Sequence, residues 1–183
     1  MGEVEFPWVG GRPSLDLCNT SVEGCDLLDD GSALAAWLSK AGCAGTCGLP
    51  EPDDLGRIRR LRDDLRAGFL AHDADAISAI LDSWFLEIPG HLAVDSETRE
   101  PVFRTDPTTF GCLVTPILLD ALAITRDHLD RVRLCAAERC SMIYLDASRN
   151  GSRRWCSMDR CGSRAKAHAY YERKRHERGP SRR

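Results

Sequence analysis

Four cysteines in the last third of the chain stand in two matched pairs that could hold a metal ion. The pairs are Cys135-x4-Cys140 and Cys156-x4-Cys161, with fifteen residues between them. Zinc binds four nitrogen or sulfur ligands in a tetrahedron, and a site of four thiolates is structural because no position stays open for water. The spacing therefore predicts one structural Zn²⁺ held by these four side chains. The alternative is four ordinary buried cysteines.

The residues between and behind the cysteines indicate how this module folds. Met142–Leu145 and Arg154–Cys156 are typical of short strands, and Asn150-Gly151 between them is a favoured hairpin turn. Residues 164–175 then form a helix-competent run. So small a segment, with few large aliphatic side chains, cannot fold on apolar burial alone, whereas a structural zinc supplies on the order of 10 kcal/mol. The pattern predicts a treble-clef-like module with a β-hairpin and a helix.

Basic residues surround this module. Residues 135–183 hold 13 Lys and Arg against 5 Asp and Glu, a net of 13 − 5 = +8, although the whole chain carries −3. The first 134 residues therefore carry −3 − 8 = −11. This asymmetry is expected when one module meets a polyanion, and the arginine guanidinium suits phosphates and guanine edges. We expect DNA contacts from Arg149, Arg153, Arg154, Arg164, Lys166, Arg173, Lys174 and Arg175. The alternative partner is an acidic protein face, including the chain's own body.

The module resembles a known family of zinc fingers. Leu145–Met158, followed by Cys161–Lys166, is similar to the CGNR zinc finger. One departure stands out, because Ser163 replaces the asparagine of the family's naming motif. The four candidate ligands are intact, but any contact that the asparagine amide makes in relatives is in question here.

The N-terminal region resembles the ABATE domain, which usually precedes this finger and carries a transcription-regulator description. The matching residues are Gly10-Gly11, Leu15-Asp16-Leu17, Asn19-Thr20 and Trp37-Leu38. Together the two resemblances span nearly the whole chain. They imply a mostly helical N-terminal domain followed by a DNA-binding zinc module.

Hydrophobic spacing predicts the elements of the N-terminal region. Leu15 and Leu17 alternate with polar neighbours, which favours a short strand or extended segment over 14–20. Helices are expected after Ser32 and Asp75 as N-caps, from about Pro52 to His72, and from Pro107 onward with Pro116 as a kink or a start. We further expect residues 91–94 and 101–104 to pair as a hairpin, and 131–135 to form a strand.

Asp16, Asn19 and Thr20 are candidate lining residues of a ligand pocket. The alternative is that they satisfy backbone amides within a turn. The sequence contains no nucleophile elbow, phosphate-binding loop, His-Glu metal helix or dinucleotide fingerprint, which weighs against an enzyme but leaves that alternative open.

Composition fits an ordinary globular protein, with 43 % hydrophobic and 29 % charged residues. No stretch is apolar enough for a membrane span, and the N-terminus is acidic, so we expect a cytoplasmic protein with reduced cysteines rather than a disulfide framework. The predicted fold class is mainly α with small β elements. The expected division is a multihelical domain over 1–130, a zinc finger over 131–178 and a tail over 179–183.

These observations favour a zinc-containing, DNA-binding transcription regulator whose N-terminal domain senses a small molecule or mediates homodimerisation. A second hypothesis is an enzyme or ligand-binding protein of a biosynthetic pathway in which the zinc module is purely structural. A third is a protein-interaction adaptor that docks through the basic finger.

Overall fold

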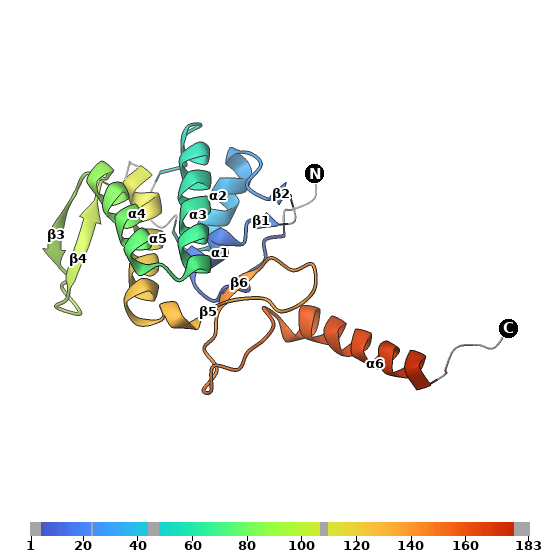
Figure 1. Cartoon of the computed structure of the whole chain (residues 1–183). Coiled ribbons are helices and arrows are strands. Elements are labelled where there is room, and N and C mark those ends of the chain that lie inside the picture. The colour runs from blue at the N-terminus through green and yellow to red at the C-terminus, as the bar shows by residue number, and fades with distance from the viewer. Residues whose placement is uncertain (1–4, 23, 44–47, 107–109, 178–183) are drawn as a thin grey trace.

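A computed structural model describes residues 5–22, 24–43, 48–106 and 110–177. It shows a body of packed helices, a small two-stranded sheet beneath them and one helix that projects away from the body (Figure 1). The predicted class, mainly α with small antiparallel strand pairs, is confirmed. No helix in the described ranges is long and apolar enough to cross a lipid bilayer.

The first helix corrects the prediction of an extended segment over 14–20. Residues Pro13–Cys18 form α1, with Pro13 in its first turn, and Asp120 accepts hydrogen bonds from the backbone amide and the hydroxyl of Ser14. Ser14 to Cys18 are all buried. Leu15 and Leu17 therefore both face apolar surroundings. In a helix that is buried on every side, the order of polar and apolar residues does not reveal the helical period, so the alternation was misleading.

Four longer helices build the rest of the body: α2 (Gly31–Lys40), α3 (Asp54–Ala71), α4 (Ala74–Glu87) and α5 (Phe110–Asp127). The helices are as expected, but two N-caps are not those predicted. Asp30 rather than Ser32 caps α2 by accepting from the amide of Ala33, and Asp73 rather than Asp75 caps α4. Pro116 lies inside α5.

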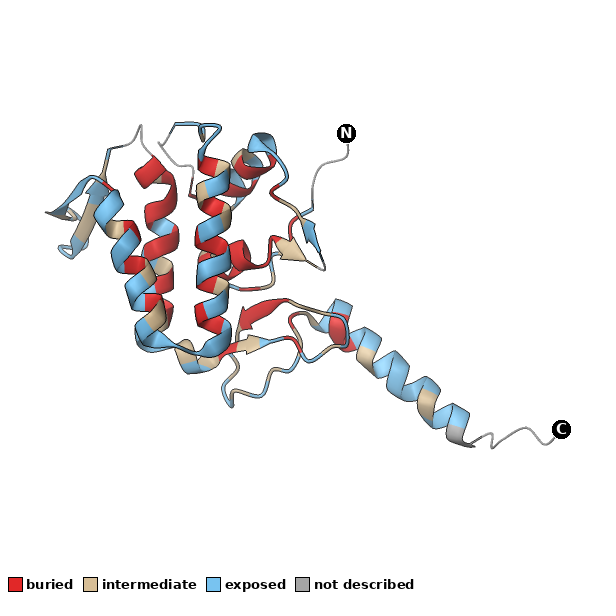
Figure 2. Ribbon diagram, turned by 45° about the horizontal axis from the view of Figure 1, so that its top comes forward, coloured by how far each residue is buried: buried red, intermediate tan, exposed pale blue. Residues whose placement is uncertain are grey.

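The main core lies where these helices face one another, as the red inner faces in Figure 2 show. Fully buried side chains of this core come from all five helices α1 to α5, with Trp37 the largest. Seven described cysteines are free thiols, as expected for a reduced chain. Cys112 departs from that expectation because it is disulfide-bonded.

Two short hairpins decorate the body. β1 (Ser21–Val22) pairs with β2 (Cys25–Asp26), and β3 (Gly90–Val94) pairs with β4 (Pro101–Thr105) at the left edge of Figure 1. The second pair confirms the predicted hairpin.

A third strand pair joins the helical body to the cysteine module. The short 3-10 helix η1 (Leu129–Arg131) leads into β5 (Val132–Leu134), which pairs antiparallel with β6 (Ile143–Leu145). Val132 and Ile143 belong to the helical core, whereas Met142 and Tyr144 pack with the cysteines. Because successive strand residues point to opposite faces, β6 serves both cores, and the cysteine module is built onto the body rather than linked to it.

The predicted hairpin between Met142–Leu145 and Arg154–Cys156 is wrong, since the described residues 154–156 form no strand. The outer edge of β6 is already occupied by the N-terminal segment. Leu145 donates its amide hydrogen to the carbonyl of Gly10 (2.9 Å), and the side-chain amide of Asn19 bonds both backbone groups of Ile143 (2.8 and 2.9 Å). The amide of Asn19 thus replaces a neighbouring strand.

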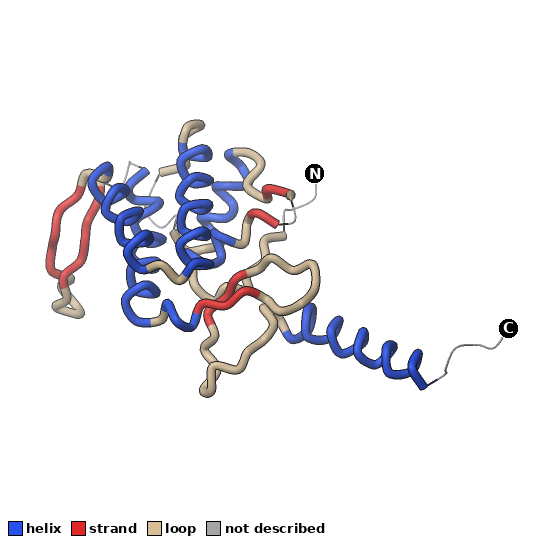
Figure 3. The backbone as a smooth tube through the Cα atoms, in the orientation of Figure 1, coloured by secondary structure: helices blue, strands red, loops and turns tan. Residues whose placement is uncertain are grey.

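The remainder of the module consists of loops, a five-residue π-helical turn η2 (Met158–Gly162) and the terminal helix α6 (Ser163–Glu177), as Figure 3 shows. The dipeptide Asn150-Gly151 forms the expected turn, in which Gly151 has φ 61° and donates its amide hydrogen to the carbonyl of Ser148. The turn therefore closes a loop instead of a hairpin.

Candidate metal centre and nucleic-acid interface

The sulfur atoms of Cys135, Cys140, Cys156 and Cys161 all lie within 4.8 Å of one another. The Sγ atom of Cys156 is 3.8 Å from that of Cys140 and 3.7 Å from that of Cys161. A tetrahedral zinc site with Zn–S bonds of about 2.3 Å has S···S edges of about 3.8 Å, whereas a disulfide needs about 2.05 Å. The spacing fits four ligands around one zinc ion and excludes disulfides among them.

The backbone that carries these ligands is held by its own amides. Cys135 follows β5 and donates its amide hydrogen to the carbonyl of Met142, and Cys156 donates its amide hydrogen toward the sulfur of Cys135 (3.4 Å). In the second pair, the Ser157 carbonyl accepts from the amides of both Cys161 and Gly162. These hydrogen bonds position the backbone of the cysteines, and so their sulfur atoms, without a metal ion.

The environment of the thiols suits a bound cation. Burial raises the pKa of Cys140 to about 11 and also raises the pKa of Cys156. Burial would raise the pKa of Cys135 as well, but amide hydrogen bonds from Cys156 and Ala137 outweigh it and lower that pKa. Four clustered thiolates therefore repel one another unless a cation neutralises them, and Zn²⁺ would hold all four deprotonated.

Arg153 serves the module itself, although the sequence predicted it as a DNA contact. Its guanidinium lies over the ring of Tyr144 at 4.3 Å and donates to the carbonyls of Trp155 and Cys156. The Tyr144 hydroxyl in turn donates to the carbonyl of Arg153 (2.6 Å). These contacts tie the loop before the second cysteine pair to β6.

Asp146 holds the same loop through hydrogen bonds to its backbone and to a serine side chain. Its buried carboxylate accepts from the hydroxyl and amide of Ser148 and from the amide of Arg153 (3.0 Å). The side-chain hydrogen bond from Ser148 is the main reason that the pKa of Asp146 is lowered. Sequence reasoning missed the structural role of this aspartate, although an Asx residue two positions before a serine is a recognisable turn signal.

The other predicted DNA-contact residues are all exposed. Arg149 and Arg154 lie on the loop, where Arg154 stacks against Trp155 at 5.2 Å, and Arg164, Lys166, Arg173, Lys174 and Arg175 lie on α6. No described residue of α6 is buried. The helix is polar all round and projects from the module, which is unusual because isolated helices of this length are marginal in water (Figure 2).

Ser163, which replaces the family's asparagine, begins α6. Its side chain is exposed, and its hydroxyl donates to the carbonyl of Met158 (3.2 Å). The Ser163 side chain therefore makes a local hydrogen bond to the turn η2.

Asp16, Asn19 and Thr20 lie together at the end of α1, but their polar atoms bind protein groups. Asn19 pairs with Ile143, Thr20 donates to the carbonyl of Leu17, and Asp16 accepts from the amide of Gly10 (2.7 Å). Burial raises the pKa of Asp16 to about 6, against the opposing effect of that hydrogen bond. The three residues form the joint between the helical body and β6.

Gly10 is part of this joint for a steric reason. A Cβ atom at Gly10 would lie 2.8 Å from the backbone nitrogen of Asp16 and from Cβ of Leu15, so only glycine allows the segment to lie against α1 while its carbonyl reaches Leu145. Gly11 follows with φ 78°, a left-handed conformation.

A helical body that carries a tetrathiolate site on its C-terminal segment defines a zinc-finger protein with one structural zinc ion. Residues 131–174 match the family model of the CGNR zinc finger, and residues 11–134 match that of ABATE, Putative stress-induced transcription regulator. The second match covers more than half of the chain, which therefore belongs to the ABATE family. No curated protein matches the chain.

Proposed function

We propose that this protein is a transcription regulator that binds DNA through the zinc module, with α6 as the main contact. The observation that carries the proposal is the exposure of α6: the helix is basic, and none of its described residues is buried, so most of its surface is open to a partner. A duplex would supply that partner, because a major groove about 12 Å wide admits one α-helix.

The charges of α6 suit such a groove. Arg164 and Arg175 lie on one side of the helix with His168 and Tyr171, at spacings of three and four residues, and Lys166, Arg173 and Lys174 lie on the other. A helix in the major groove is flanked by a phosphate backbone on each side, so positive charge on both flanks is complementary.

The N-terminal domain supports this assignment through the joint at Asn19. Since β6 packs on both cores, the body sets the orientation of the module. Sensing of a small-molecule effector and dimerisation remain predictions from the sequence.

Binding of zinc-loaded protein to labelled double-stranded DNA, followed by fluorescence anisotropy across a salt series, tests the proposal. If six basic side chains contact phosphates, log affinity should fall with log salt concentration at a slope of roughly −5. A protein that carries one zinc per chain and shows no salt-sensitive DNA binding would contradict the assignment.

A further inference from the structure

Both cysteine pairs carry an arginine at the same position. The first pair reads Cys135-Ala-Ala-Glu-Arg-Cys140 and the second reads Cys156-Ser-Met-Asp-Arg-Cys161, so Arg139 and Arg160 each directly precede the second cysteine. Arg139 has φ 62°, a left-handed backbone conformation that is uncommon for arginine. Arg139 is not among the DNA contacts predicted above, although this repeat in the sequence identifies it.

The closed sulfur cluster brings these two arginines to one place. Arg139, Arg160 and Arg164 line the same hollow of about 200 Å³. Three of the cysteines, Cys140, Cys156 and Cys161, also line it, as do Val9 and Val22 of the N-terminal segment. The three come from separate segments: the first cysteine loop, η2 and the first turn of α6. We call this hollow the arginine pocket.

The guanidinium groups of the pocket have no partner in the described chain. Arg12, Arg57, Arg62 and Arg126 form ion pairs with carboxylates. Within the described ranges, Arg139, Arg160 and Arg164 form no ion pair and no side-chain hydrogen bond, and all three are exposed. Three guanidinium groups without a carboxylate partner around one hollow offer the hydrogen-bond donors and the charge that an anion requires.

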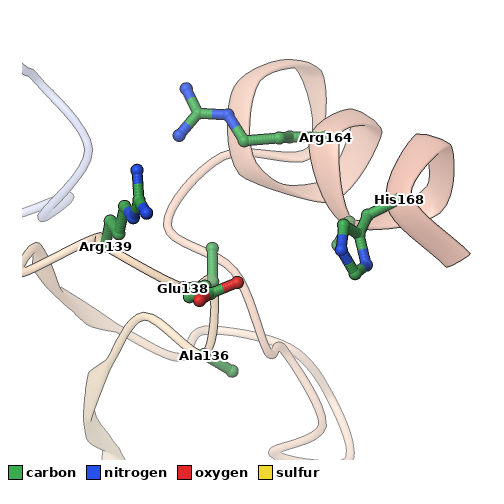
Figure 4. A pocket seen from close by; sticks show the side chains of 7 residues that line it. Ala136, Glu138, Arg139, Arg164 and His168 are labelled. Atoms are coloured by element: carbon green, nitrogen blue, oxygen red, sulfur yellow. The ribbon is translucent and has the colours of Figure 1, made fainter.

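One further feature fits an anion. Ser141 also lines the pocket, but its buried hydroxyl oxygen is not accessible to a ligand there. The acidic side chain of the first loop, Glu138, lines an adjoining groove that Arg139 and Arg164 also line. The carboxylate of Glu138 is turned toward His168, while Arg139 and Arg164 extend toward the other side (Figure 4).

The size of the pocket limits the ligand. Sites for drug-sized molecules and nucleotides take about 300–1,000 Å³, so a hollow of about 200 Å³ accommodates one phosphate group with its substituents outside. The pocket is also next to the start of α6, where a backbone phosphate lies if the helix enters the groove. The four thiolates with zinc carry a formal charge of about −2, which three guanidinium groups more than offset.

We propose that the arginine pocket holds one phosphodiester group of the DNA backbone and so anchors the first turn of α6 on the duplex. This proposal rests on the proposed function, because it names the DNA group that the zinc module grips. Charge compensation of the zinc site is the competing role for the same arginines, and it predicts loss of zinc rather than loss of a DNA contact.

The test compares the wild-type chain with Arg139→Gln/Arg160→Gln in the salt series, with zinc content measured on each sample. The double variant should keep one zinc per chain and bind DNA up to about tenfold more weakly than the wild type. The slope of log affinity against log salt concentration should be smaller in magnitude by about 1, the value for one lost phosphate. Arg60→Gln, which removes an exposed charge from α3, is the matched control and should change neither quantity.

Several results would overturn the proposal. An unchanged slope and affinity in a zinc-loaded double variant would do so, while wild-type DNA binding would keep the proposed function intact. Zinc loss in both the double variant and Arg160→Gln alone would assign the arginines to charge compensation.

A second experiment titrates the wild-type protein with inorganic phosphate at fixed ionic strength and follows the arginine Nε–H resonances. Saturation there, with unchanged DNA affinity in the variant, would assign the pocket to a small phosphate ligand. No DNA binding by the wild type would overturn both proposals.

Discussion

Replacing Cys156 by Ser is expected to abolish zinc binding and unfold the C-terminal module. Cys156 is buried, and its sulfur lies at tetrahedral-edge distances from two other cysteines, so the variant keeps only three thiolates. The core of the module consists of the cysteines with Met142 and Tyr144, too small a cluster to be stable alone. Structural zinc contributes on the order of 10 kcal/mol in such modules, so the loss should be complete rather than partial.

Metal analysis and limited proteolysis measure this result. The variant should contain no stoichiometric zinc and should be cleaved rapidly within residues 135–177. The helices α1 to α5 should keep their helical circular dichroism because nearly all of their core side chains lie outside that range. Cys25→Ser, at an exposed free thiol, is the control and should retain one zinc per chain. Full zinc content and wild-type protease resistance in Cys156→Ser would contradict the assignment of the site.

Neutralising α6 is expected to remove DNA binding without destabilising the protein. The variant replaces Lys166, Arg173, Lys174 and Arg175 by Gln. At 0.1 M salt, tenfold below 1 M, each phosphate contact contributes about 0.9 to the logarithm of the DNA affinity. Loss of four contacts should therefore weaken binding roughly a thousandfold or more. All four side chains are exposed, and glutamine is a good helix former, so the unfolding midpoint should stay unchanged.

Anisotropy titration and chemical denaturation check both parts of this prediction. Arg60→Gln/Arg104→Gln, which removes two exposed charges from the body, is the control and should bind DNA like the wild type. If the α6 variant binds within a few fold of the wild type, the interface lies on the loop residues Arg149 and Arg154 or elsewhere.

The features that the sequence predicted correctly are those set by neighbouring residues. The cysteine spacing and the apolar periodicity of α3 and α5 are local signals, and the helix after Gly162 follows from its composition. The hairpin of β3 and β4 is also local, because a short polar turn joins its strands.

The failures come from contacts between distant parts of the chain. The predicted partner of β6 was wrong because Asn19, more than a hundred residues away, occupies the outer edge of the strand. This contact between distant residues also explains why Asn19 was predicted as a pocket residue, although its side chain bonds to the backbone of Ile143. Arg153 could not be separated from the exposed arginines by type alone, since only the fold shows that its guanidinium lies on Tyr144.

The central claim is that the zinc-bound cysteine module presents the DNA-binding surface, and the most direct test is DNA affinity as a function of zinc occupancy. Metal-free full-length protein, prepared with a chelator under reducing conditions, would be titrated with zinc in the presence of labelled duplex. DNA binding is expected to be absent without zinc, to rise in proportion to bound zinc and to saturate at one equivalent per chain. Equal DNA affinity with and without zinc would contradict it.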